Sequence, residues 1–132
     1  MFIKILFAGF AGLVIIHGLI HLIGFQVYAR GAQVQEMPFK TSFLNGSLDL
    51  GASGTRIYGF LWLLPTLGFV LAGAGFLLHT NGWQPVLIAS SLVSLVLTGI
   101  DWSNAFRGTL IDMILLGAVL LSPVAARFGL SF

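Results

Sequence analysis

Long apolar stretches and one polar stretch alternate along this chain. Four segments are almost entirely apolar and long enough to cross a bilayer, since a spanning helix needs about 20 such residues. These segments are residues 2–28, 57–79, 84–102 and 109–126. Residues 29–55, between the first two, are mostly polar. The pattern predicts a single domain over residues 1–132, made of four transmembrane helices.

Two of the three expected connections are short. One runs from His79 to Trp83 and contains Asn81-Gly82, a strong turn signal, and residues 103–108 form the other. Short links require neighbouring helices to run in opposite directions. The expected fold is therefore an all-α integral membrane protein, an antiparallel four-transmembrane-helix bundle with one long polar loop between helices 1 and 2.

The polar loop, residues 29–55, is longer than connections in compact domains usually are. Loops of such length are usually functional or disordered. Within it, Asn45-Gly46 predicts a two-residue hairpin turn. The apolar side chains of Phe39 and Phe43 predict that the loop packs on the end of the bundle.

The composition supports lipid as the solvent. Hydrophobic residues make up 58% of the 132 residues and charged residues 8%, against about 25% charged in a soluble domain. A water-soluble protein of this size would leave its apolar excess facing water. No basic face indicates nucleic-acid binding, and the absence of cysteine excludes thiolate metal sites and disulfide exchange. We expect a multi-pass protein of the bacterial inner (plasma) membrane with the lipid bilayer as its main partner.

The distribution of Lys and Arg predicts an orientation. Four basic residues fall on the face that carries the first and third connections, namely Arg30, Lys40, Arg56 and Arg107. The opposite face has Lys4 and Arg127. Because cytoplasmic loops carry the excess of Lys and Arg, the long loop is expected to be cytoplasmic with both termini outside. A compact external loop would invert this orientation.

Ionisable residues inside the predicted spans are the candidates for function, since each costs about 2.5–3.5 kcal/mol at mid-helix. His17 and His21 are four residues apart and share one helix face. A stripe of Ser91, Ser94 and Thr98 leads along the third helix to its end. Alternating helix directions bring several polar groups to the loop half of the bundle, and His79 to the other end. The predicted polar cluster comprises His17, His21, Tyr28, Arg56, Asp101, Arg107 and Asp112.

Each of these signals also has a structural interpretation. Groups near helix ends need only be solvated, the serine and threonine stripe is typical of helix packing, and Asp112 with an arginine could form a structural ion pair. The two histidines would each need a buried partner. His17 and His21 could bind a metal with a carboxylate oxygen from Asp101 or Asp112, one could ligate a haem alone, or the group could relay protons.

Three blocks of sequence resemble a known family. They are His21-Leu22-Ile23-Gly24-Phe25, the block from Arg56 to Leu63 and the block from Trp102 to Thr109. In this order and spacing they resemble the four-helix membrane region of an uncharacterised bacterial membrane protein family, DoxX-like in appearance. The resemblance implies the four-helix fold. It implies no activity, although DoxX-like relatives include accessory membrane subunits of quinone-linked redox systems. The family pattern usually has Asn where Asp112 stands, so it does not imply a shared role for this charge.

The sequence leaves three functions open and contains no motif that names a reaction. The first is an accessory or scaffold subunit of the inner membrane, bound to a membrane partner subunit. The second is a membrane redox protein with a metal, haem or quinone site near His17 and His21. The third is a minimal transporter or proton-coupled carrier, which would require a homo-oligomer because four helices provide few walls for a path.

Overall fold

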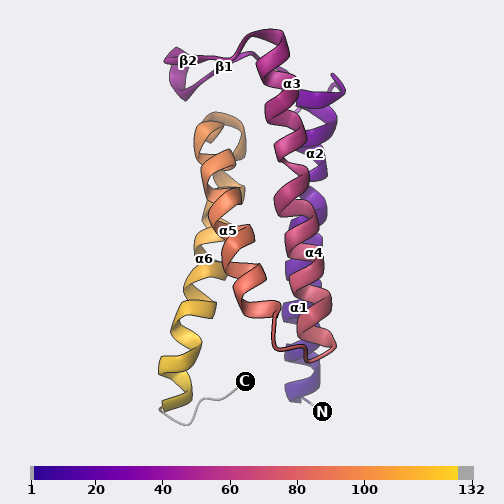
Figure 1. Cartoon of the computed structure of the whole chain (residues 1–132), viewed down its shortest axis with the longest axis vertical. Helices are drawn as coiled ribbons and strands as arrows, with labels where there is room; N and C mark the ends of the chain where they lie inside the picture. Colours follow the sequence, from indigo (N-terminus) through magenta and orange to yellow (C-terminus); the bar gives the residue numbers. More distant parts are fainter. Residues whose placement is uncertain (1, 128–132) are drawn as a thin grey trace.

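The computed structural model describes residues 2–127, with side chains described for residues 5–122. Helices dominate it (Figure 1). In chain order the elements are α1 (Phe2–Ile20), α2 (Leu22–Gly24), the π-helix η1 (Phe25–Ala29), β1 (Ser42–Phe43), the 3-10 helix η2 (Leu44–Gly46), β2 (Leu48–Asp49), α3 (Gly51–Leu61), α4 (Leu63–Leu77), α5 (Trp83–Ile100) and α6 (Trp102–Arg127).

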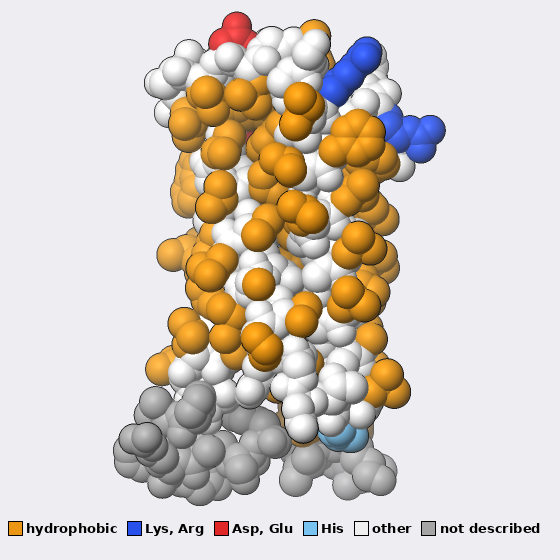
Figure 2. Space-filling view, viewed as in Figure 1, with side chains coloured by type: hydrophobic (Ala, Val, Ile, Leu, Met, Phe, Trp, Pro, Cys, Tyr) orange, Lys and Arg blue, Asp and Glu red, His pale blue; other side chains and the backbone are white. Residues whose placement is uncertain are grey.

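Four helical segments are long and apolar enough to cross a membrane, as predicted. The first joins most of α1 to α2 and η1, and the second joins α3 to α4. The four segments are Ile5–Ala29, Gly51–Leu77, Trp83–Ile100 and Trp102–Ser122. Apolar side chains cover the sides of the molecule, and the Lys, Arg, Asp and Glu side chains visible in Figure 2 lie at the end that carries the loop.

The helices pack in the order α1, α4, α5 and α6. α1 lies along α4, α4 along α5, and α5 along α6, whereas α1 and α6 have far fewer close backbone approaches. Tight α1–α4 packing needs glycine, because a Cβ on Gly18 would lie 2.7 Å from the Phe69 Cβ. Pairing of Thr98 with Thr109 and of Ser94 with Asp112 shows that α5 and α6 run in opposite directions.

The connection predicted over residues 103–108 is wrong. α5 ends at Ile100 and α6 begins at Trp102, so a single residue outside helical geometry, Asp101, separates them. The carbonyl oxygen of Asp101 accepts hydrogen bonds from the amides of Asn104 and Ala105, both at 2.9 Å. These two bonds begin α6 at once, and residues 103–108 become its first turns.

The second span begins earlier than predicted, at Gly51 instead of residue 57. Gly51 adopts a φ of +61°, a conformation that suits glycine. Its amide donates a 3.0 Å hydrogen bond to the Asp49 Oδ1, which satisfies one free donor at the start of α3. The long loop therefore ends about one and a half turns earlier than the hydropathy pattern indicates.

The long loop contains a short hairpin, but not one with a two-residue turn. β1 and β2 are antiparallel, with Phe43 opposite Leu48, so the connection comprises residues 44–47. Leu44 and Asn45 have φ values of +48° and +55°, and Gly46 has +93°, which explains the wider turn. Phe43 is buried, with its ring 4.8 Å from that of Tyr58, whereas Phe39 is exposed.

The apolar interior divides into two clusters along the bundle. The cluster nearer the loop comprises Val27, Tyr28, Met37, Phe43, Tyr58, Trp62, Leu97 and Ala105. The cluster farther from the loop comprises Val14, Phe69, Ala72, Leu87, Leu115 and Val119. Beyond the second, the Phe76 ring lies 4.5 Å from Phe7, 5.0 Å from Phe10 and 4.9 Å from Trp83. We call Phe7, Phe10, Phe76 and Trp83 the aromatic cluster.

Candidate metal site

His17 and Asp112 join the two helices that otherwise approach each other little. His17 lies on α1 and Asp112 on α6, and the His17 Nε2 is 2.7 Å from the Asp112 Oδ1. Only 3% of the His17 side chain and none of the Asp112 side chain is exposed. The partner of the buried carboxylate is thus a histidine, and the alternative of an Asp112–arginine pair is wrong for the described residues.

His21 and Ser94 extend this contact. The Ser94 Oγ lies 2.5 Å from the Asp112 Oδ2 and 2.5 Å from the His21 Nε2. His21 is one helical turn from His17, and its Nδ1 donates a 2.8 Å hydrogen bond to the His17 carbonyl. We call the resulting chain of His17, Asp112, Ser94 and His21 the His–Asp–Ser–His network. It links α1, α5 and α6 through buried side chains.

Aromatic rings enclose the two imidazoles. The His17 and His21 rings are perpendicular to each other with centroids 4.8 Å apart. Phe69 on α4 lies 4.9 Å from His17 and 5.5 Å from His21, and Trp62 lies 5.7 Å from His21. An apolar enclosure strengthens electrostatic interactions, since little solvent screens them. Any charge held here is therefore tightly coupled to its neighbours.

A count of hydrogens shows that the network, with Asp112 ionised, is one hydrogen short. The hydrogen on the His21 Nδ1 is used by the His17 carbonyl, and a neutral imidazole has only one. His17 supplies a hydrogen to Asp112, and Ser94 can supply one either to Asp112 or to His21. With an ionised Asp112, one of the three contacts then brings two lone pairs together at 2.5 Å. One added proton, or a metal ion bound among these atoms, removes that repulsion.

The same atoms have the chemistry of a metal site. His17, His21 and Asp112 each offer one ligand atom, and these atoms lie within 4.8 Å of one another. Imidazole and carboxylate ligands suit divalent transition metals. The hydrogen bond from the His21 Nδ1 to a backbone carbonyl is the outer contact that orients most metal-binding histidines. The residues present therefore fit a metal ion.

Tyr28 and Asp101 lie in a second cluster, nearer the loop. The Tyr28 hydroxyl donates a 2.5 Å hydrogen bond to the Asp101 Oδ2 and accepts one of 3.1 Å from Asn104. The Lys40 Nζ lies 2.6 Å from the Asp101 Oδ1 and 2.6 Å from the Ser103 Oγ. We call these five residues the loop-end cluster. Lys40 thus brings the long loop to a fully buried carboxylate at the α5–α6 junction.

Tyr28 is positioned by the unusual end of the first span. The π-helix η1 ends the span, and Gly59 of α3 packs directly against it. A Cβ on Gly59 would lie 2.2 Å from the Ala29 amide nitrogen, so only glycine allows this approach. The close packing brings the Tyr28 ring to 5.4 Å from Tyr58 and 5.5 Å from Phe43. It aims the Tyr28 hydroxyl at Asp101.

The structure divides the predicted cluster in two and leaves two of its members outside. Arg56 and Arg107 are exposed, and the Arg107 guanidinium lies 5.5 Å from the centre of the Phe106 ring. Neither joins the His–Asp–Ser–His network or the loop-end cluster. Both are near helix ends, where long basic side chains extend into solvent. His79 is exposed at the opposite end of the bundle, as expected.

Two threonines lie between the clusters. The Thr109 Oγ1 on α6 donates a 2.8 Å hydrogen bond to the Thr98 Oγ1 on α5, and both side chains are buried. The Thr98 Oγ1 in turn donates to the Ser94 carbonyl at 2.9 Å. Buried polar side chains therefore follow the α5–α6 contact from Asp101 to Asp112.

The cluster predicted from the sequence lacks Ser94, Lys40, Ser103 and Asn104, and the first two make the contacts that matter most here. Ser94 belongs to the predicted polar stripe, but nothing in the stripe distinguishes it from Ser91 as a partner of His21 and Asp112. The sequence analysis uses Lys40 only in the count of basic residues that predicts the orientation. A lysine in a long polar loop does not indicate that its partner is a buried carboxylate. Both assignments depend on how distant segments meet.

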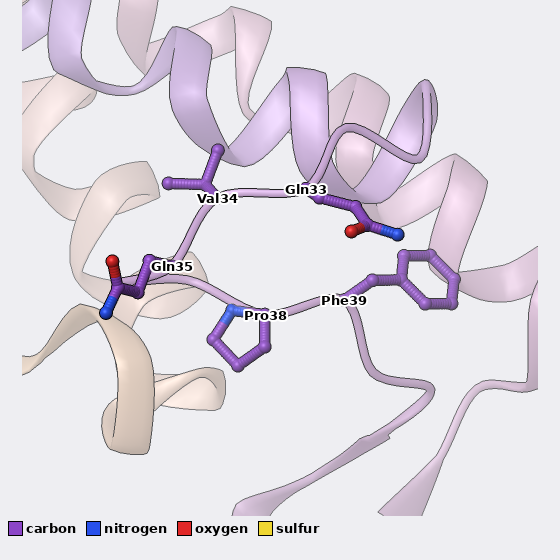
Figure 3. A pocket seen from close by; sticks show the side chains of 5 residues that line it. All are labelled: Gln33, Val34, Gln35, Pro38 and Phe39. Atoms are coloured by element: carbon purple, nitrogen blue, oxygen red, sulfur yellow. The ribbon is translucent and has the colours of Figure 1, made fainter.

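A hollow in the loop adjoins the loop-end cluster through Pro38 and Phe39. Figure 3 shows the side chains that line it, Gln33, Val34, Gln35, Pro38 and Phe39. It presents two neutral amides and an apolar wall, without a charged group. It therefore lacks the chemistry for a cation, and we do not include it in the site.

Comparison with known proteins gives no relative: no protein-family model matches the chain, and neither the curated proteins nor the solved structures include a match. The resemblance to a DoxX-like family stays a prediction from the quoted blocks of sequence.

Proposed function

We propose that this chain is a multi-pass membrane protein, an antiparallel four-helix bundle, that binds one divalent transition-metal ion through His17, His21 and Asp112. The apolar side surfaces and the four long apolar helices support a membrane location. The inner membrane, a cytoplasmic loop and assembly with a partner subunit remain compatible with this proposal.

The observation that supports the metal site best is the short three-contact chain that lacks one hydrogen. The ligand atoms of His17, His21 and Asp112 lie within 4.8 Å of one another, and a cation among them would remove the repulsion between lone pairs at the Ser94 contacts. A buried ionised carboxylate without a positive partner would be costly. A divalent ion coordinated by two imidazoles and one carboxylate meets that requirement with the ligands present.

The packing favours a small ion over the other cofactors that the sequence leaves open. A haem would need an open plane beside one imidazole, but Phe69 and the other imidazole cover both His17 and His21. A quinone would need a flat slot beside the histidines, which these rings also occupy. The site therefore favours the metal alternative of the redox hypothesis, and binding itself is the proposed activity.

The test is the metal content of purified protein in detergent, before and after incubation with Zn²⁺ or Co²⁺. We expect one equivalent per chain, with a visible Co²⁺ spectrum of nitrogen and oxygen coordination. His21→Ala and Asp112→Asn should lose the bound metal, because each variant removes a ligand. Loss of a ligand's outer hydrogen-bond partner alone already lowers metal affinity about 10- to 100-fold. His79→Ala is the matched control, because His79 is exposed at the other end.

Equal metal content in the wild type, His21→Ala and His79→Ala would contradict the proposal. A wild type that takes up neither ion would also contradict it. The missing hydrogen would then be a proton held within the network, and ¹⁵N NMR of the histidine rings would show no metal-bound imidazole nitrogen.

A further inference from the structure

The polar groups between the two clusters suggest how a cation reaches the site. We infer that Asp101, Thr98 and Thr109 mark a route from the loop end of the bundle to the metal site, and that Lys40 closes the outer end of this route. The inference rests on the proposed function for the identity of the cation, but the route can be tested without a metal.

The route follows the contact between α5 and α6. Asp101 is at its outer end, Thr98 and Thr109 lie one turn farther in, and Ser94 and Asp112 lie another turn beyond. All five side chains are less than a tenth exposed. Oxygen atoms at successive turns can replace the water around a cation at each step, as oxygen-lined paths through membrane proteins do.

The opposite approach is closed by apolar packing. Phe69 covers both histidines, Val14 and Leu87 belong to the apolar cluster farther from the loop, and the aromatic cluster follows at the far end. A cation moving through that half would lose its hydration with few oxygen atoms to replace it. The distribution of polar groups therefore gives the route a direction, from the loop side inward.

Lys40 occupies the outer end of the route as a tethered cation. Its ammonium contacts Asp101 and Ser103, while its side chain remains 25% exposed. An incoming cation would meet the same carboxylate and must displace the ammonium. Lys40 is the partly exposed member of this pair, and an incoming cation that displaces its ammonium leaves the buried Asp101 carboxylate paired with a positive charge. The rest of the loop is held by Phe43, which packs between Tyr28 and Tyr58.

Cysteine accessibility tests the route directly, because the chain has no native cysteine. Thr98→Cys places a thiol on the route, and its reaction with a charged, water-soluble thiol reagent is followed in detergent without added metal. Lys40→Met keeps the length of the side chain and removes its charge. We expect it to raise the labelling rate of Thr98→Cys about tenfold, equivalent to about 1.4 kcal/mol in the opening equilibrium.

Three controls separate a closed route from general loosening. Lys40→Arg should keep the slow rate, because it keeps the charge. Arg107→Met removes an exposed charge outside the clusters and should leave the rate unchanged. Ser91→Cys lies on α5 about one turn farther from the loop than Ser94, off the proposed route, and should stay unlabelled in the Lys40→Met background. If Lys40→Met does not purify as a folded protein, Ser103→Ala removes the second Lys40 contact and should raise the rate in the same direction.

A second measurement joins the route to the proposed function. In a protein that binds Co²⁺, Lys40→Met should speed the appearance of the Co²⁺ spectrum about tenfold and leave the final stoichiometry unchanged. An unchanged labelling rate of Thr98→Cys would overturn the route, whatever the metal content. Faster labelling with no metal in the wild type would keep the route and overturn the metal site.

Discussion

The two halves of the bundle are built from different interactions. The half nearer the loop buries two carboxylates, two histidines, two tyrosine hydroxyls and several alcohols, and pairs most of them across helices. The half farther from the loop holds apolar side chains and the aromatic cluster. Both halves share α5 and α6, but η1, α3 and the long loop belong to the loop half alone. Packing without charge fixes one half, and pairing of charges fixes the other.

The comparison suggests a division of roles. Polar groups inside a membrane protein are expensive, and they tend to mark sites and pathways. Helix packing in lipid depends on close contact between small residues and large rings. We therefore expect changes in the aromatic half to affect stability alone and changes in the polar half to affect stability and binding together.

The largest effect is expected for Asp112→Ala. It leaves the His17 Nε2 and the Ser94 Oγ without their shared acceptor, and breaking a buried pair of this kind lowers the free energy of unfolding by about 3–5 kcal/mol. Bound metal should be lost as well. Unfolding of purified protein in mixed micelles, with metal analysis of the same samples, gives both values. If Asp112→Ala were as stable as the wild type, buried polar pairs would not stabilise the loop half, and the proposed difference between the two halves would be wrong.

Phe76→Ala tests the aromatic half. The Phe76 ring contacts Phe7, Phe10 and Trp83, and truncation of a buried phenylalanine costs about 3 kcal/mol through the cavity it leaves. Metal stoichiometry should stay at the wild-type value, because no ligand is near. Leu77→Ala is the control, since Leu77 is exposed. Loss of metal in Phe76→Ala would show that the two halves are coupled.

A smaller effect is expected at Gly18 of α1, which lies at the boundary between the halves, with Gly9 of the same helix as its control. Gly18→Ala places a Cβ 2.7 Å from the Phe69 Cβ and should destabilise the protein by about 1–3 kcal/mol. Because Phe69 covers both histidines, metal affinity should fall too. Gly9→Ala meets no atom within 4 Å and should change stability by less than about 0.5 kcal/mol. Equal stability of the two variants would refute the close α1–α4 approach.

The smallest effect is expected at the start of α3. Asp49→Ala removes the acceptor for the Gly51 amide, an exposed contact worth about 0.5–1 kcal/mol. Amide hydrogen exchange in the first turn of α3 should become faster, while metal content stays unchanged. Glu36→Ala, which removes another exposed acidic side chain of the loop, should leave this exchange rate unaltered.

The four long helices could be predicted because runs of apolar residues are a local property of the sequence. The helix break could not be placed, since Asp101-Trp102-Ser103-Asn104 resembles a polar turn and only the bonds to the Asp101 carbonyl show that a helix starts at once. The site was predicted in part. The spacing of His17 and His21 puts both on one helix face. That Ser94 contacts His21 and Asp112 depends on how α5 is rotated against α6. That Lys40 contacts Asp101 depends on the path of the loop.

The one-residue junction at Asp101 has a consequence for chain length. Adding a single residue after Asp101 would turn α6 by about 100° relative to α5. Asp112 would then leave its contacts with His17 and Ser94, and an apolar neighbour would take its place. The exposed tip at Asn45, by contrast, has no side chain on which either cluster depends. Insertions should be tolerated at the hairpin tip and should abolish binding at the α5–α6 junction.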